Sequence, residues 1–354
     1  MQASTAFPPA WRTRAPVSAV TGWPAAIAPR MGSSVTAHLR ADFARSSFNE
    51  SDAVLESPAR VAVWLWAAAM GFLAALLCNA WVWRSAIHLC GGRIDRARAV
   101  ACYGVGSLVN TAMPARIGDA ARIALFSRAF GGRRDRYWTT GSVFGAIGAA
   151  RALVLGVLVV VGAAMGALPL WPVLVLGGFV GAAVLAAFFA RGRRARRHIS
   201  HALDAFRALG RSPVGGARIV AWVAAATAAR IGGAAAIAAA LGVSHPLLAA
   251  VIIVPALDLA TAIPLTPGNI GIATGTVAVA LQSKGVDLTK ALTTGIALQA
   301  IETAVSIVVG AGGALFLARF GSAQTRRRTL TAAGAATALV LAGAFSATVL
   351  VDAV

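Results

Sequence analysis

The chain has 354 residues, of which 58% are apolar and only 12% are charged, and its mean hydropathy is +0.75. About a quarter of the residues in a soluble domain are charged, so this composition favours an integral membrane protein over a soluble enzyme. The only cysteines have no paired spacing, which excludes a disulfide scaffold and a zinc site; they are Cys78, Cys90 and Cys102.

The formal net charge of +20 comes almost entirely from arginine, since Lys284 and Lys290 are the only lysines among 32 cationic residues. Such a charge is also typical of nucleic-acid-binding proteins. Here, however, the arginines cluster between apolar stretches, as the positive-inside rule predicts for a membrane protein. We therefore expect a basic cytoplasmic face beside anionic lipid, and no nucleic-acid partner.

Residues 1–60 differ from the rest of the chain. They hold six arginines, four acidic residues and six prolines, and no apolar run there reaches spanning length. This composition predicts a disordered N-terminal tail. It lacks the compact apolar core and small-residue cleavage site of a signal peptide.

Six stretches have the roughly 20 apolar residues that a membrane-spanning helix needs. We expect all of them to be α-helical, because backbone polar groups in lipid must pair within the segment. They are Val61–Trp83, Gly141–Gly166, Leu170–Ala190, Ile219–Leu241, Ala291–Leu317 and Leu330–Val351.

Two further apolar stretches are interrupted by proline and glycine. Ala99–Phe130 contains Pro114 and Gly118, and Pro246–Gln282 contains Pro264 and Gly268. Non-helical backbone at membrane depth is tolerated only inside protein or beside water. Each stretch is therefore predicted to be a re-entrant helical hairpin.

The two breaks resemble each other at an offset of 150 residues, since Thr-Ala-x-Pro begins at Thr111 and again at Thr261. Each predicted hairpin follows one long span and precedes two more. The sequence thus predicts a transmembrane domain over 61–351, with halves 61–190 and 219–351 joined by a basic loop, 191–218.

Arginine-rich loops set the expected orientation. Arg84–Arg98, Arg128–Arg136, Arg191–Arg218 and Arg319–Arg328 all favour the cytoplasm. The first hairpin then enters from the cytoplasm and the second from outside. This inverted topology is found in many secondary transporters. The fold class predicted is an all-α polytopic membrane protein with about six full spans, two re-entrant hairpins and an inverted repeat.

Ionisable groups inside a membrane are costly and mark candidate sites. Arg116, Asp119 and Arg122 follow Pro114 at spacings of three, on one helical face. A helix N-terminus and an arginine together suit a phosphate, with Asp119 holding an arginine or binding the amine of a zwitterionic headgroup. The alternative is an interfacial helix whose arginines extend to the headgroups.

Four more ionisable residues fall within the apolar stretches. Arg151 and Arg230 either line a path or form structural ion pairs, Arg151 with Glu302 or Asp258. Glu302 is a candidate for proton coupling, or else a structural partner of Arg151 or Arg230. In the second hairpin, Thr266–Gly271 forms a tight turn that either cradles an anion with its N–H groups or only lets two half-helices pack.

These breaks carry a resemblance to a known family. Asn110–Arg122 resembles the "N-x-x-x-P-x-R-x-G-[DE]-x-x-R" pattern of the lysylphosphatidylglycerol synthase transmembrane region, also called the flippase-like domain family, and Pro264–Gly271 is similar to its "P-x-x-P-G-G-x-G" pattern. The resemblance covers about residues 60–320. It departs at Ala150, where the family often has Glu, and at Ala273–Gly275, where the family often has a Glu nearby.

The resemblance implies a lipid-handling membrane domain without the aminoacyl transferase to which the family domain is often fused. We expect a lipid flippase in the cell membrane, multi-pass, that binds an anionic headgroup between the two hairpins. The expected substrate-binding residues are Asn110, Pro114, Arg116, Gly118, Asp119, Arg122, Arg151, Pro267, Gly268, Asn269, Gly271 and Glu302.

The expected partners are membrane lipids that carry an anionic or isoprenoid-phosphate group. No catalytic residue, cofactor or metal is expected, because acidic residues and histidines are scarce, and the sequence predicts no particular oligomeric state. Two alternatives remain. One is a membrane enzyme or enzyme subunit of lipid or glycan assembly, and the other is a small-solute exporter.

Overall fold

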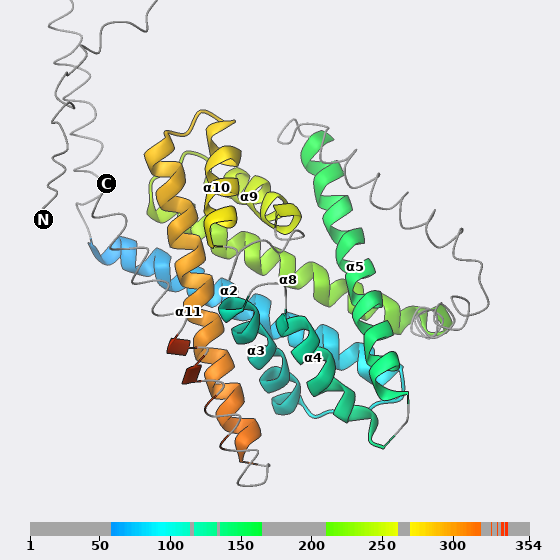
Figure 1. Ribbon diagram of the computed structural model, residues 1–354. Helices are drawn as coiled ribbons and strands as arrows, with labels where there is room; N and C mark the ends of the chain where they lie inside the picture. The colour runs from blue at the N-terminus through cyan, green and yellow to red at the C-terminus, as the bar shows by residue number, and fades with distance from the viewer. Residues whose placement is uncertain are drawn as a thin grey trace, which may run out of the picture. The chain divides into compact units, whose positions relative to one another are not determined.

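The computed structural model describes residues 58–113, 117–132, 135–164, 210–260 and 270–319, with a few positions between 327 and 338. Every regular element in these residues is helical (Figure 1). Four helices are long and four are short. The long helices are α2 (Pro58–Leu89), α5 (Arg136–Ala164), α8 (Pro213–Ala240) and α11 (Leu288–Ala318). The short helices are α3 (Arg96–Ala112), α4 (Ile117–Ser127), α9 (Pro246–Ala260) and α10 (Ile270–Gln282).

The four long helices confirm four of the predicted spans. Each is long and apolar enough to cross a membrane. The predicted span at Leu170–Ala190 lies outside the described residues, and the one at Leu330–Val351 lies almost entirely outside them. The same holds for nearly all of the tail over 1–60 and for most of the loop over 191–218.

The short helices form two pairs at the positions of the predicted hairpins. The second pair begins at Pro246 and ends at Gln282, as predicted. In the first pair α3 and α4 run antiparallel, because Gly106 on α3 lies against Arg122 while Asn110 contacts Asp119. How deeply either pair enters a membrane stays a prediction.

The segment Arg84–Arg98 is mostly helix, so its prediction as a loop was wrong. α2 continues to Leu89 and α3 begins at Arg96, which leaves a short connection. α2 continues because Trp83 and Ile87 are buried on one face of this last part, while Arg84 lies over the ring of Trp81.

The described elements repeat in order, as predicted: a long helix, a short pair and a long helix. The first long helices of the two halves, α2 and α8, pack antiparallel. Leu89 lies against Gly215, Trp81 stacks on Trp222 at 6.2 Å, and a Cβ on Gly71 would lie 2.8 Å from the Gly233 Cα atom. The second long helices of the halves, α5 and α11, also run in opposite directions (Figure 1).

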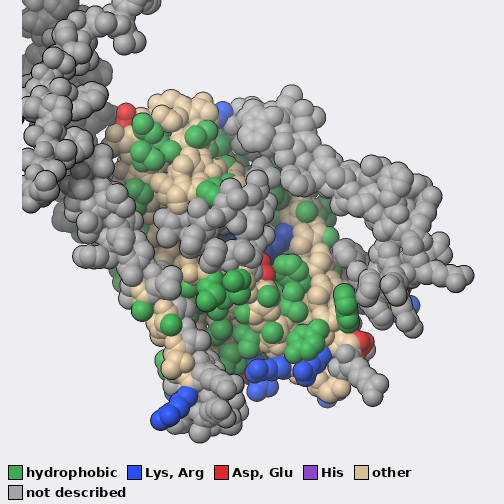
Figure 2. All heavy atoms as spheres, in the orientation of Figure 1, with side chains coloured by type: hydrophobic (Ala, Val, Ile, Leu, Met, Phe, Trp, Pro, Cys, Tyr) green, Lys and Arg blue, Asp and Glu red, His purple; other side chains and the backbone are tan. Residues whose placement is uncertain are grey.

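Basic segments from distant parts of the sequence gather at one end of this helical unit, the basic end. The Arg93 N–H donates to the Ala129 oxygen at 3.1 Å, and Leu89 lies beside Gly215 near the start of α8. Ala101 near the start of α3 lies against Gly313 near the end of α11. The basic end is the lower edge of the molecule in Figure 2, where basic side chains lie below an apolar area. The described basic segments thus share one end, as the prediction requires, and the side of the membrane that they face stays a prediction.

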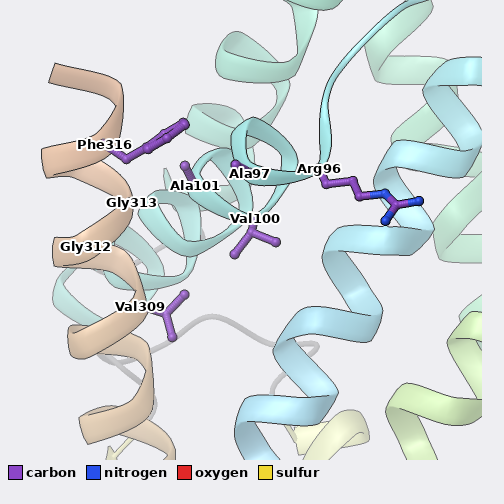
Figure 3. A pocket seen from close by; sticks show the side chains of 8 residues that line it. All are labelled: Arg96, Ala97, Val100, Ala101, Val309, Gly312, Gly313 and Phe316. Carbon is purple, nitrogen blue, oxygen red and sulfur yellow. The ribbon is translucent and has the colours of Figure 1, made fainter. Parts of the chain in front are cut away.

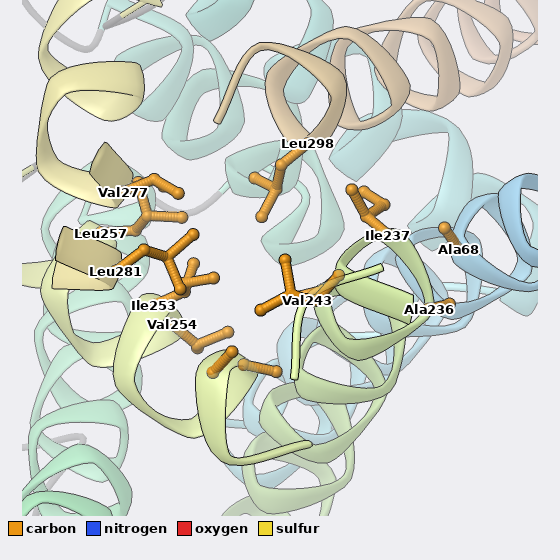
Figure 4. Packing of buried hydrophobic residues seen from close by; sticks show 14 of the residues in the cluster. Ala68, Ala236, Ile237, Val243, Ile253, Val254, Leu257, Val277, Leu281 and Leu298 are labelled. Carbon is orange, nitrogen blue, oxygen red and sulfur yellow. The ribbon is translucent and has the colours of Figure 1, made fainter. Parts of the chain in front are cut away.

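Two hydrophobic cores lie in the two halves, and each receives side chains from the other half. One core joins α8, α9, α10 and α11 and includes Ala68 and Phe72 from α2; Figure 4 shows its Ile253, Leu281 and Leu298. The other core joins α2, α3, α4 and α5 and includes Ile219 and Val223 from α8. The crossed α2–α8 pair thereby connects the halves.

Candidate functional site

Several ionisable side chains within the long apolar helices lie where these helices pass between the two cores. Arg151 lies near the middle of α5 and Glu302 near the middle of α11. On α8, Arg230 follows the residues that enter one core and precedes those that enter the other. Figure 2 shows acidic and basic side chains between the two apolar areas of this face.

The first hairpin contains an ion pair between Arg122 and Asp119. Arg122 Nη1 donates to Asp119 Oδ1 at 2.6 Å, and Asn110 Nδ2 donates to the same oxygen at 3.0 Å. Arg122 is only 6% exposed, and its Nε has no hydrogen-bond partner. Arg122 is therefore buried within the hairpin, and it does not extend to headgroups as the alternative interpretation required.

Two glycines let this pair form. A Cβ on Gly106 would overlap the Arg122 side chain, and a Cβ on Gly118 would overlap both the Gly106 oxygen and the Asn110 side chain. Any larger residue at these positions would separate α3 from α4. Gly118, one of the predicted site residues, thus acts through packing in this structure.

Tyr103 on α3 connects the first hairpin to α5. The Arg122 guanidinium lies 4.2 Å from the Tyr103 ring centroid, a cation–π distance. Arg151 Nη2 donates to the Tyr103 hydroxyl oxygen at 3.4 Å and also to Asn79 Oδ1 on α2. Tyr103 is 6% exposed, so one buried aromatic side chain contacts two arginines.

A second charged group lies in the other half. Arg230 Nη1 donates to Asp258 Oδ1 at 2.6 Å, and Arg230 Nη2 lies 3.5 Å from Glu302 Oε1. The side chains of Asp258 and Glu302 are about one third exposed, at 35% and 36%. Glu302 therefore pairs with Arg230, which was one of the two partners expected for it, and Arg151 pairs with neither acid.

The helices that carry the two groups pack directly on each other, because Gly104, next to Tyr103 on α3, lies against Val309 on α11, the helix of Glu302. The two charged groups thus belong to one polar region, which we call the central polar cluster. It is built from α2, α3, α4, α5, α8, α9 and α11, and its members are Asn79, Tyr103, Asn110, Asp119, Arg122, Arg151, Arg230, Asp258 and Glu302.

The predicted site residues are only partly within the described residues. The structure brings Asn110, Gly118, Asp119, Arg122 and Arg151 together through Tyr103. Gly271 is exposed on α10, with open space around it. Five predicted residues lie outside the described part: Pro114, Arg116, Pro267, Gly268 and Asn269.

Sequence reasoning missed Tyr103 and Asn79. Tyr103 is one of two tyrosines in the chain, and Asn79 is an amide within an otherwise apolar span. A polar side chain in such a stretch needs a partner, so both residues carried a usable signal.

Arg151 differs from the other arginines of the cluster because it has no carboxylate partner among the described residues. Arg122 and Arg230 each pair with at least one carboxylate, whereas the partners of Arg151 are a neutral amide and a neutral hydroxyl. Arg151 is also exposed. Its charge remains available to an anion, and its guanidinium suits the oxygens of a phosphate. No three metal-ligating side chains lie together within the described residues.

The comparisons with known proteins agree with this picture of a membrane domain. The model of the protein family described as "Lysylphosphatidylglycerol synthase TM region" matches residues 43–310. Comparisons with curated proteins and with solved structures gave no match.

Proposed function

The chain belongs to the lysylphosphatidylglycerol synthase TM region family, and on this basis we propose that it is a flippase-like transporter of an anionic lipid. The substrate class is a phospholipid or a polyprenyl-phosphate-linked glycolipid, moved across the cell membrane. The protein supplies binding and a path, and it catalyses no chemical reaction.

One observation carries the proposal: Arg151, in the middle of a long apolar helix, has a positive charge whose partners, Asn79 and Tyr103, are both neutral. In this proposal the lipid phosphate accepts hydrogen bonds from Arg151, and from Arg116, which the sequence places between α3 and α4. Arg122 is buried and already paired with Asp119, so its role is to hold α3 against α4 and to support Tyr103. Tyr103 in turn holds the Arg151 guanidinium in place.

Alternating access follows from the two halves. The short pairs α3–α4 and α9–α10 are the re-entrant hairpins of this proposal, and α2 and α8, which pack antiparallel, belong to an inverted repeat. In transporters built this way one half rocks against the other around a central site. Movement between the halves would expose the headgroup at Arg151 first to one side of the membrane and then to the other.

Mass spectrometry of co-purifying lipids tests the binding step. We expect one anionic or isoprenoid lipid to be enriched with the wild-type protein and lost from Arg151→Ala and from Arg116→Ala. Arg218→Ala is the matched control, because Arg218 is exposed at the basic end and outside the cluster. The same bulk lipids in every sample would contradict the proposal and favour an exporter or an enzyme subunit.

A further inference from the structure

Two arginines at the basic end share one tryptophan. The guanidinium carbons of Arg84 on α2 and Arg96 on α3 both lie 5.6 Å from the Trp81 ring centroid. Trp81 is itself stacked on Trp222 of α8. Two like charges thus lie beside the same aromatic ring at the junction of three helices.

Neither charge is neutralised within the described part of the chain. Arg84 and Arg96 form no hydrogen bond and no ion pair there, and Arg84 Nε is a buried polar atom without a partner. A buried donor without an acceptor is destabilising, and two neighbouring cations repel each other. An anion placed between them would remove both costs.

Arg96 also belongs to the lining of an apolar groove on the other side of α3. A cavity of 430 Å³ lies between α3 and α11, with Arg96 and Phe316 toward the basic end and Val100 and Val309 deeper in the fold. In Figure 3 the Arg96 side chain extends from α3 toward α2, while Val100 and Val309 border the space between the helices. The volume is within the range of small-molecule sites.

Glycine shapes this groove in two ways. Gly313 is needed for helix packing, because a Cβ there would lie 2.8 Å from the Ala101 oxygen. Its neighbour Gly312 lines the groove and has no atom within 4 Å of an added Cβ. A side chain at Gly312 would thus fill the groove and leave the contact between α3 and α11 intact.

We propose that this place binds a resident anionic phospholipid. Its phosphate lies between Arg84 and Arg96, Trp81 lies at the headgroup level, and one acyl chain occupies the groove. Charge complementarity selects an anionic headgroup, since basic pockets between membrane helices recognise such lipids. The apolar groove selects a lipid over a free phosphate. The site is separate from the central polar cluster, because its arginines contact no member of that cluster in the structure.

The test measures lipid binding to delipidated, full-length protein by the shift in its melting temperature. Phosphatidylglycerol should raise the melting temperature of the wild type more than phosphatidylcholine does. Arg84→Gln/Arg96→Gln should weaken the affinity for phosphatidylglycerol roughly fivefold for each arginine lost. Gly312→Leu should weaken it by blocking the acyl chain. Arg60→Gln, at the opposite end of α2, and Gly145→Leu are the controls, since both positions are exposed and outside the site.

Several outcomes would overturn the inference. Equal stabilisation by phosphatidylcholine would show that the site does not select an anionic headgroup. An equal shift in melting temperature with glycerol 3-phosphate would show that the groove binds no acyl chain. Arg96 is exposed, so Arg96→Gln should fold even if the double variant does not. If this single variant bound phosphatidylglycerol as tightly as the wild type, the phosphate site would be contradicted. Loss of binding in Arg151→Ala, with the Arg84→Gln/Arg96→Gln variant unaffected, would assign the lipid to the transport site instead.

Discussion

Arg122 is a buried cation whose charge is balanced inside its own hairpin. The spacing of three between Asp119 and Arg122 predicted that they share a helical face, and the 2.6 Å ion pair confirms this. Their burial was not predictable from α4 alone, because it depends on the missing side chain of Gly106 on a neighbouring helix.

Removing Asp119 should destabilise the protein strongly. Asp119→Ala leaves the Arg122 guanidinium buried without its carboxylate, which costs about 3–5 kcal/mol in comparable pairs. The melting temperature in detergent should fall, and Asp119→Leu/Arg122→Met should recover most of the loss. Asp95→Ala is the control, because Asp95 is exposed and its side chain makes no capping bond. Equal melting temperatures for Asp119→Ala and the wild type would show that the pair is not buried.

Two substitutions of Tyr103 should distinguish its role in positioning Arg151 from its role in helix packing. Tyr103→Phe keeps the ring under Arg122 but removes the hydroxyl that accepts from Arg151. We expect its melting temperature to stay near that of the wild type while its affinity for labelled phosphatidylglycerol falls roughly tenfold. Tyr103→Leu should lower both quantities. The assigned role would be wrong if Tyr103→Phe bound the lipid as the wild type does.

At the scale of elements, proline and glycine made the boundaries of the second hairpin predictable. Pro246 begins α9 because proline is tolerated in the first helical turn. α10 ends at Gln282, and Gly285, with φ 81°, completes the turn that follows. Arg84–Arg98 was misread because arginine was taken as a loop signal, although a helix that ends at the membrane surface can carry arginines on its last turns.

The close approach of α2 and α8 rests on glycine and should be sensitive to a single methyl group. Gly71→Ala places a Cβ 2.8 Å from the Gly233 backbone, so we expect it to lower the melting temperature. Gly232→Ala is the matched variant, because its Cβ would meet no atom within 4 Å. Without a clash it should be neutral or stabilising by about 0.5–1 kcal/mol. Equal effects of both substitutions would contradict the packing of these helices.

At the scale of the whole molecule, the sequence predicted the repeated order of elements because both halves contain the same break at the same offset. It did not predict which helices of the two halves meet. The pairings of α2 with α8 and of α3 with α11 depend on the close approach of backbones at Gly71, Gly104 and Gly310. Small residues are common throughout this alanine-rich chain, so these three glycines do not stand out in the sequence as contact positions.

The basic end should face the cytoplasm. In a variant without Cys78, Cys90 and Cys102, single cysteines at Arg93 and at Arg211 should be protected from a membrane-impermeant maleimide in intact cells. A cysteine at Lys284, in the connection between α10 and α11, should react. Reaction at all three positions, or protection of Lys284→Cys alone, would contradict the orientation by the positive-inside rule.

Transport of a labelled lipid in reconstituted vesicles tests the central claim most directly. With fluorescent phosphatidylglycerol as the probe, wild-type protein should move the lipid between leaflets faster than protein-free vesicles do. Arg151→Ala should return the rate to that of empty vesicles, and Arg218→Ala should match the wild type. A wild-type rate no higher than that of empty vesicles, with this probe and with a labelled polyprenyl phosphate, would contradict the flippase, whereas full activity in Arg151→Ala would contradict the site.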